Sequence, residues 1–266
     1  MKLENIIEVI ENSTQQEGSY SRRNAIKKAG DVGLKVALAS IPLAFASSIA
    51  KNAFAKTSST VVEVLNFALT LEYLESKFYQ MGLSASGLIP AVDRPIFTQI
   101  ANHEGAHVTT LISTINSLSG TPVSQPTFDF TGGNGSGTGP YADVFTNYTT
   151  FLALSQAFED LGVRAYKGQA GNLQSNAAVL TAALSIHSVE ARHAAEVRRL
   201  RAAKGWITGN DASGLPAAIY AGEDNLTQGG VVVTSITDVG ANAMTEGFDE
   251  PLTMPAVLAI ADPFIV

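Results

Sequence analysis

The sequence has no cysteine and few charged residues. Without cysteine, the 266-residue chain cannot form disulfides, zinc-thiolate sites or iron–sulfur clusters, and it cannot use a thiol as a nucleophile. Charged residues make up 15% of the chain, whereas hydrophobic residues make up 45%. An average soluble domain has roughly 25% charged residues. This balance is typical of a compact domain with a sizeable core, and it argues against a disordered chain.

The sequence also lacks a basic face of the kind that binds nucleic acid. The net charge is −7, with +2 in residues 1–55 and −9 in the remainder. Nucleic-acid binding requires clustered Lys and Arg that displace counterions from phosphates. The one basic cluster lies at the end of a predicted helix, where we expect it to interact with the helix dipole; it consists of Arg198, Arg199, Arg201 and Lys204. We therefore expect no nucleic-acid partner.

The apolar run near the N-terminus, residues 36–46, is too short and too polar to be a stable membrane span, which needs about 20 apolar residues. It follows the pair Arg22-Arg23, ends in a small-x-small site at 44–46 and is followed by a second one at 53–55. These are the parts of a secretory signal, and the arginine pair resembles a twin-arginine export signal. We expect residues 1–55 to be an export signal and the mature protein to be periplasmic or secreted. The alternative is an N-terminal amphipathic helix with an accidental arginine pair.

Four later segments have helical periodicity. They run from about Thr60 to Met81, Asp93 to Leu118, Ala142 to Gly168 and Leu173 to Lys204. The first two and the last two are joined by short connections, whereas a long Gly- and Ser-rich segment joins the second to the third. A four-helix bundle with a single crossover requires this pattern; a flexible linker between two helical hairpins is the alternative. We predict an all-α bundle over residues 56–205 and an irregular extension, residues 206–266, packed on it, with room for one short helix near its end.

All four histidines lie in the second and fourth predicted helices. Two of them follow a glutamate by three residues, as Glu104-x-x-His107 and Glu190-x-x-His193. This spacing places each pair on one helical face, where a carboxylate and an imidazole can bind one divalent ion. One such match could arise by chance, but two matches in equivalent helices point to a shared site.

The first and third helices each contribute a glutamate in apolar surroundings, Glu72 and Glu159. A lone carboxylate there is costly to bury unless it is paired or binds a metal. A tyrosine follows each glutamate two turns later on the same face, Tyr79 and Tyr166. Each half of the chain thus repeats Glu-x6-Tyr followed by Glu-x-x-His. Four glutamates and two divalent cations would be formally neutral, whereas without metal the carboxylates would repel one another and take up protons.

This set resembles the ligands of ferritin-like di-iron and di-manganese carboxylate proteins. The resemblance covers about residues 60–205 and implies two Fe or two Mn ions with the following ligands: Glu104 and Glu190 as bridges, Glu72 and Glu159 as terminal ligands, and His107 and His193 on one metal each. With its signal, long loop and residues 248–253, the chain is also similar to bacterial ferritin-like proteins related to plant desiccation-associated proteins.

The chain departs from many redox-active relatives just before each bridging glutamate. They carry an aspartate there that orients the opposite histidine, whereas this sequence has His103 and Val189. The departure puts redox turnover in doubt but not metal binding. We expect His103 to be structural, Asp160 to be a solvated neighbour of the site, and Trp206 to anchor the end of the fourth helix.

Other roles stay open at this point. Glu75 competes with Glu72 as a ligand, although polar neighbours favour Glu72. His187 is either an extra group near the metals or a helix-surface histidine. Tyr79 and Tyr166 either hydrogen-bond ligand carboxylates, act as redox tyrosines, or pack in the core with their hydroxyls satisfied.

The resemblance leaves two classes of function. The first is an oxidoreductase (ferroxidase, peroxidase or catalase-like) whose small-molecule partner is an oxidant or a metal ion. The second is a non-catalytic extracytoplasmic stress or desiccation-related protein in which the metal stabilises the fold. A storage cage is a weaker option, and homo-oligomerisation and the choice of iron or manganese are left open.

Overall fold

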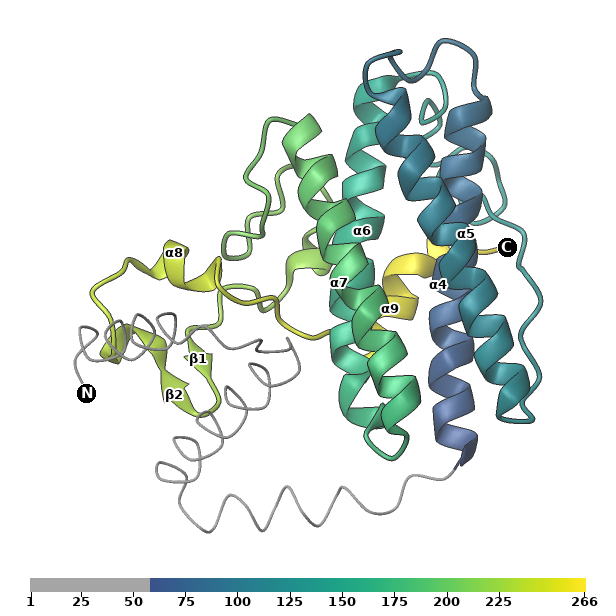
Figure 1. Ribbon diagram of the computed structural model, residues 1–266. Helices are drawn as coiled ribbons and strands as arrows, with labels where there is room; N and C mark the ends of the chain where they lie inside the picture. Colours follow the sequence, from purple (N-terminus) through teal and green to yellow (C-terminus); the bar gives the residue numbers. More distant parts are fainter. Residues whose placement is uncertain (1–57) are drawn as a thin grey trace, which may run out of the picture. The chain divides into compact units, whose positions relative to one another are not determined.

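The structure is a computed structural model that describes residues 58–266 (Figure 1). The expected export signal, residues 1–55, lies outside this range. Four long helices form the body of the protein: α4 (Ser58–Ser84), α5 (Arg94–Ser117), α6 (Tyr148–Ala170) and α7 (Ala177–Leu200). The sequence predicted each of these helices. None of the described helices is both long and apolar enough to span a membrane.

Helices α6 and α7 begin later than the sequence predicted because asparagine caps decide where they start. The side chain of Asn147 accepts a hydrogen bond from Thr149 N at the start of α6, and Asn176 accepts one from Val179 N at the start of α7. Such caps satisfy backbone N–H groups that have no partner within the helix. The residues just before Asn176 form a short 3₁₀ turn instead, η1 (Gly171–Leu173).

The helices pair as two hairpins, α4 with α5 and α6 with α7. The segment between α5 and α6 runs back along the length of the bundle, so α5 and α6 run in the same direction (Figure 1). This is the single-crossover bundle that the sequence predicted. The alternative, separate hairpins joined by a flexible linker, would leave one face of each hairpin uncovered.

Inside the bundle, a polar layer lies between two apolar clusters, and a third cluster joins α4 and α6 to the C-terminal segment. One of the first two contains Phe78, Phe97, Phe151 and Phe158, with the rings of Phe78 and Phe151 stacked at 4.9 Å between centroids. The other is aliphatic and includes Leu69, Leu111, Ile115 and Ile186. In each helix the candidate ligands fall between residues of the two clusters, so water is kept from the polar layer on both sides.

The chain beyond α7 forms short elements around the bundle. They are η2 (Ala217–Tyr220), the antiparallel pair β1 (Thr227–Gln228) and β2 (Val231–Val232), η3 (Val233–Ser235), α8 (Ala241–Thr245), α9 (Met254–Ala261) and η4 (Asp262–Phe264). Helix α9 is the short C-terminal helix that the sequence predicted, and it packs on α6. Gly168 allows a close approach there, because a Cβ at this position would lie 1.9 Å from Leu252 O.

Buried arginines attach this C-terminal segment to the bundle. Arg164 of α6 is fully buried, lies 2.7 Å from the carboxylate of Glu223, and donates hydrogen bonds to three backbone carbonyls, those of Ile219, Ala221 and Glu250. The second attachment is a network in which Asp160 accepts from Arg198 at 2.6 Å and from the Tyr220 hydroxyl at 2.6 Å.

Two expectations about this region were wrong. Asp160 is 1% exposed, so it is not a solvated neighbour of the site but the buried partner of Arg198. Burial raises the pKa of Asp160, and the Arg198 charge opposes that rise. Trp206 is 52% exposed and does not anchor α7 by packing; its backbone carbonyl accepts from Arg198, and its side chain interacts with Glu246.

Candidate metal centre

All four bundle helices contribute to one buried polar cluster. The glutamates Glu72, Glu104, Glu159 and Glu190 have no exposed surface, and the histidines His107 and His193 are 7% and 5% exposed. The i, i+3 spacing on α5 and α7 directs each Glu-His pair inward, while α4 and α6 each supply one glutamate from the opposite side. The structure therefore brings together the six side chains that the sequence singled out.

The six side chains form two overlapping groups of four. Glu72, Glu104, His107 and Glu190 each offer one ligand atom to the first group, and Glu104, Glu159, Glu190 and His193 do so in the second. Within each group the ligand atoms lie within 4.8 Å of one another. Glu104 and Glu190 belong to both groups, so two ions bound there would share these two carboxylates.

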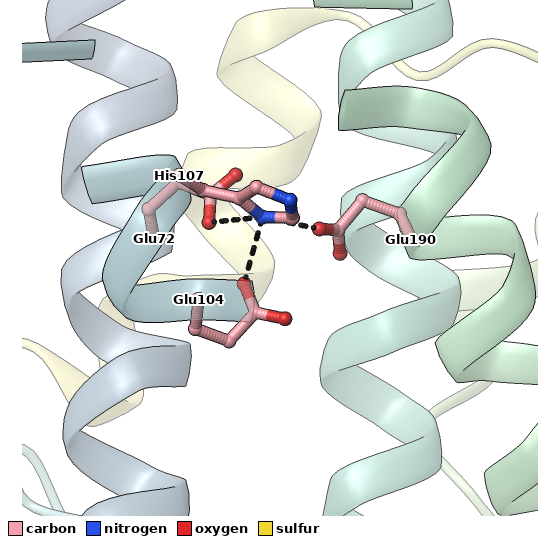
Figure 2. A group of neighbouring side chains, drawn as sticks. All are labelled: Glu72, Glu104, His107 and Glu190. Carbon is pink, nitrogen blue, oxygen red and sulfur yellow. Dashed lines mark hydrogen bonds and ion pairs between the residues drawn. The ribbon is translucent and has the colours of Figure 1, made fainter. Parts of the chain in front are cut away.

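The first group is arranged around His107 (Figure 2). Its Nδ1 atom lies 3.1 Å from Glu72 Oε2, 3.1 Å from Glu104 Oε2 and 3.2 Å from Glu190 Oε1. A single N–H group cannot satisfy three carboxylates at once. Three carboxylate oxygens and one imidazole nitrogen this close together instead resemble the donor atoms that surround a bound cation.

The second group is arranged around His193, whose Nδ1 atom lies 2.8 Å from Glu104 Oε1 and 3.3 Å from Glu159 Oε2. These atoms are close but not aligned as hydrogen bonds. Glu104 Oε1, Glu159 Oε2, both oxygens of Glu190 and His193 Nδ1 have no hydrogen-bond partner among the described residues. Buried polar atoms are rarely left without a partner, so these orphaned donor atoms fit a pair of cations.

Burial and mutual repulsion dominate the electrostatics of the metal-free cluster. Burial and the nearby Glu104 charge raise the pKa of Glu72 to about 8, and burial with the same charge raises the pKa of Glu190 well above its ordinary range. Burial lowers the pKa of His107, but the carboxylates of Glu104, Glu190 and Glu72 close to its Nδ1 atom outweigh burial and raise the pKa to about 12. Without metal the cluster therefore holds protons, which metal binding would displace.

The tyrosine of each half hydrogen-bonds a glutamate of the other half. The Tyr79 hydroxyl donates to Glu159, and the Tyr166 hydroxyl donates to Glu72. Both phenol groups are buried, and burial together with these carboxylates raises the pKa of both. Of the roles that the sequence left open, the structure shows the first: these tyrosines hydrogen-bond the carboxylates of Glu159 and Glu72.

Glu75 is a buried carboxyl group that the sequence analysis passed over in favour of Glu72. It is 3% exposed but lies outside both ligand groups. Burial and the charge of Glu190 raise its pKa well above the ordinary range. Glu75 and Glu190 both lie against Gly162 of α6. A Cβ at position 162 would lie 2.8 Å from Glu190 Oε2 and 3.1 Å from Glu75 Oε1. Polar neighbours in the sequence hid the burial of Glu75, and only its i+3 spacing from Glu72 could have indicated it.

His103 contacts the cluster directly. Its Nδ1 atom lies 2.9 Å from His193 Nε2, and the two rings stack with centroids 5.1 Å apart. His103 thus occupies the position at which many redox-active relatives carry an aspartate. It holds the His193 ring, whose Nδ1 atom faces Glu104. Val189, at the equivalent position on α7, offers no polar atom to His107. His187 lies outside both ligand groups.

We expect His103→Ala to weaken metal binding on the His193 side by about 10- to 100-fold, as loss of a histidine-orienting partner does in other metal sites. The affinity on the His107 side should change much less. Stepwise titration of the metal-free protein with Mn(II), followed by electron paramagnetic resonance, would separate the two affinities. His187→Ala is the control on α7, and an equal loss from both variants would contradict a positioning role for His103.

The comparison with known families agrees with this geometry. A family model described as a ferritin-like domain matches residues 60–203, which covers α4 to α7 and more than half of the chain. No curated protein matches the sequence. The single-crossover bundle, the buried glutamate and histidine cluster within it and the family match lead to one conclusion: the chain belongs to the ferritin-like domain family.

Proposed function

We propose that this protein binds two Fe or two Mn ions in the Glu-His cluster and is exported through a twin-arginine-type signal to the periplasm or beyond. The observation that carries the metal proposal is the sharing of Glu104 and Glu190 between the two ligand groups. A shared carboxylate can offer one oxygen to each of two cations. The two cations can then lie close together, and neither oxygen of the glutamate is left without a partner. Bridging is therefore assigned to these two residues and terminal ligation to Glu72 and Glu159.

The donor set supports iron or manganese. It consists of carboxylate oxygens and imidazole nitrogens, which suit both metals, and the chain has no thiolate that would favour softer ions. Two divalent ions neutralise four glutamates, which favours a buried site of low net charge. The choice between the two metals then depends on supply in the compartment where the protein folds.

A pair of such ions, when bound, supplies Lewis acidity and one-electron redox capacity toward O2, peroxide or Fe(II). The chain's own residues prepare the site for this chemistry. Tyr79 and Tyr166 hold the terminal carboxylates, and His103 holds the His193 ring. The apolar clusters on both sides exclude water, which strengthens every charge interaction in the layer between them.

The export proposal rests on Arg22-Arg23, the apolar run at 36–46 and the Ala-x-Ala sites at 44–46 and 53–55. The twin-arginine route carries folded proteins, so the metal could be loaded before export. Homo-oligomerisation is compatible with the fold, and the metal proposal does not depend on it.

One observation favours a second candidate, a non-catalytic stress or desiccation-related protein. All four glutamate ligands are fully buried, and none of the six candidate ligands lines the large cavity that opens beside α6. In this alternative the ions act only on stability, because binding to the native state alone raises the free energy of unfolding.

Turnover separates the two candidates. With the metal-loaded full chain, an oxidoreductase should consume peroxide or oxidise Fe(II) many times per site, and Glu104→Ala should abolish that consumption. Oxygen-electrode and ferrous-chelator assays would measure it. A metal-loaded protein that reacts no more than once per site while its Tm rises on metal addition would overturn the redox proposal and support the stabilising role.

A further inference from the structure

A large cavity in the described part of the chain lies outside the metal cluster. It has a volume of about 570 Å³ and lies between α6, η2 and the C-terminal elements α9 and η4. Its floor is formed by α6 residues that include Leu154, Phe158 and Leu161. The volume falls within the range of about 300–1,000 Å³ that is typical of small-molecule sites. Protein interiors rarely leave a space of this size unless something binds there.

The lining is almost entirely hydrocarbon. Tyr141 is the only lining residue whose side chain carries a polar atom, and its hydroxyl makes no hydrogen bond to any described residue. The remaining lining residues are Gly, Ala, Pro, Leu, Ile and Phe. Ala218, Ala221 and Ala259 are exposed at the opening, so small side chains leave the mouth wide. Such a site suits a molecule with a long apolar body and one hydrogen-bonding end.

The walls are held in place without a ligand. Arg164 donates hydrogen bonds to the carbonyls of Ile219 and Ala221, which fixes the η2 wall against α6. On the other side, the ring of Phe264 packs at 5.1 Å from that of Phe158 and at 5.8 Å from that of Tyr141. A preformed apolar cavity needs little ordering when a ligand enters, which favours binding.

The cavity is separate from the metal cluster but adjacent to it. Phe158 and Leu161 also line a small void of about 10 Å³, which holds about one water molecule. That void touches Glu75, the carboxyl group beside Glu190. Phe158 and Leu161 thus form a wall between the large cavity and the charged layer. A hydrocarbon in the cavity would gain apolar contact without removing water from the carboxylates.

We propose that this cavity binds a single long-chain fatty acid or fatty alcohol, with its hydrocarbon chain along α6 and its polar end within reach of Tyr141. The assignment does not rest on the metal proposal, because none of the six candidate ligands lines the cavity. A flexible chain is favoured over a polar metabolite because the walls offer only one side-chain hydrogen-bonding group.

The test uses the full chain and the fluorescent fatty acid cis-parinaric acid. We expect saturable fluorescence enhancement at one probe per chain and displacement by palmitic acid. Ala218→Trp should weaken binding by at least about tenfold, since the indole would fill the mouth of the cavity. Tyr141→Phe should weaken it by about fivefold through loss of one hydrogen bond.

Ala217→Trp is the matched control, because Ala217 is an exposed neighbour in the same turn but does not line the cavity. It should leave probe binding unchanged. Circular dichroism would establish that the variants fold alike. Absence of probe binding by the folded wild-type chain, non-saturable uptake, or equal binding by both tryptophan variants would overturn the proposal. Glu104→Ala should bind the probe normally, so failure of the metal proposal would not affect the outcome.

Discussion

Replacing Glu104 with alanine is expected to abolish binding of both metal ions, whereas Glu72→Ala should weaken mainly one. The difference follows from the geometry, because Glu104 belongs to both ligand groups and Glu72 to only one. Glu190→Ala should resemble Glu104→Ala, since Glu190 is the other shared carboxylate. Loss of a shared ligand also removes one of the two carboxylate charges that both cations share, so the repulsion between the cations is less well screened.

The measurement is the metal content per chain, by mass spectrometry, of full-length protein purified without chelator and loaded anaerobically with Fe(II) or Mn(II). The wild type should hold about two ions, the number that neutralises its four glutamates. Glu63→Ala is the matched control, because Glu63 is an exposed glutamate on the same helix as Glu72. A stably folded wild type that takes up no metal would rule out the two-metal centre.

The six candidate ligands could be predicted because each is specified by local spacing. An i, i+3 pair shares a helical face in any α-helix, and the same device occurs in both halves of the chain. Repetition then implied that the two halves fold together. The bundle itself followed from helical periodicity and from one long connection between two short ones, which required no knowledge of side-chain contacts.

The residues that the sequence did not predict depend on partners far away in the chain. Asp160 seemed solvated because its partner Arg198 lies on another helix, 38 residues later. The burial of Glu75 depends on Gly162 of α6, which lets two carboxylates approach that helix. The contact between His103 and His193 spans 90 residues. Periodicity reports which face of a helix is buried, but it does not report which polar group lies opposite.

The C-terminal extension was predicted least well for the same reason. Its composition indicated an irregular segment with one short helix, and α9 is that helix. Its position depends on Arg164, whose partners are mostly backbone carbonyls that no side-chain pattern reveals. The cavity beside α6 exists only because the extension is held there, so it had no signature in the sequence.

Arg164→Ala is expected to lower the free energy of unfolding by about 3–5 kcal/mol, the cost of removing one partner of a buried ion pair. Arg164 is fully buried, and its loss leaves the carbonyls of Ile219 and Ala221 without their donor. The Glu223 carboxylate loses its cationic partner and keeps the hydrogen bond from Glu250 N. Burial already raises the pKa of Glu223 to about 7 although the Arg164 charge opposes that rise. In the variant, Glu223 should therefore take up a proton rather than stay charged.

Urea unfolding followed by circular dichroism would measure the change, with Arg199→Ala as the control. Arg199 forms an exposed i, i+3 pair with Glu196, and such solvent-screened pairs contribute little to stability. The double variant Arg164→Ala/Glu223→Gln should recover part of the loss, because glutamine is neutral without the free-energy cost of taking up a proton on folding. Full additivity of the two substitutions would show that they do not interact.

Arg164→Ala should also weaken cis-parinaric acid binding, since the arginine holds one wall of the cavity, while the metal content should stay unchanged because no ligand contacts this arginine.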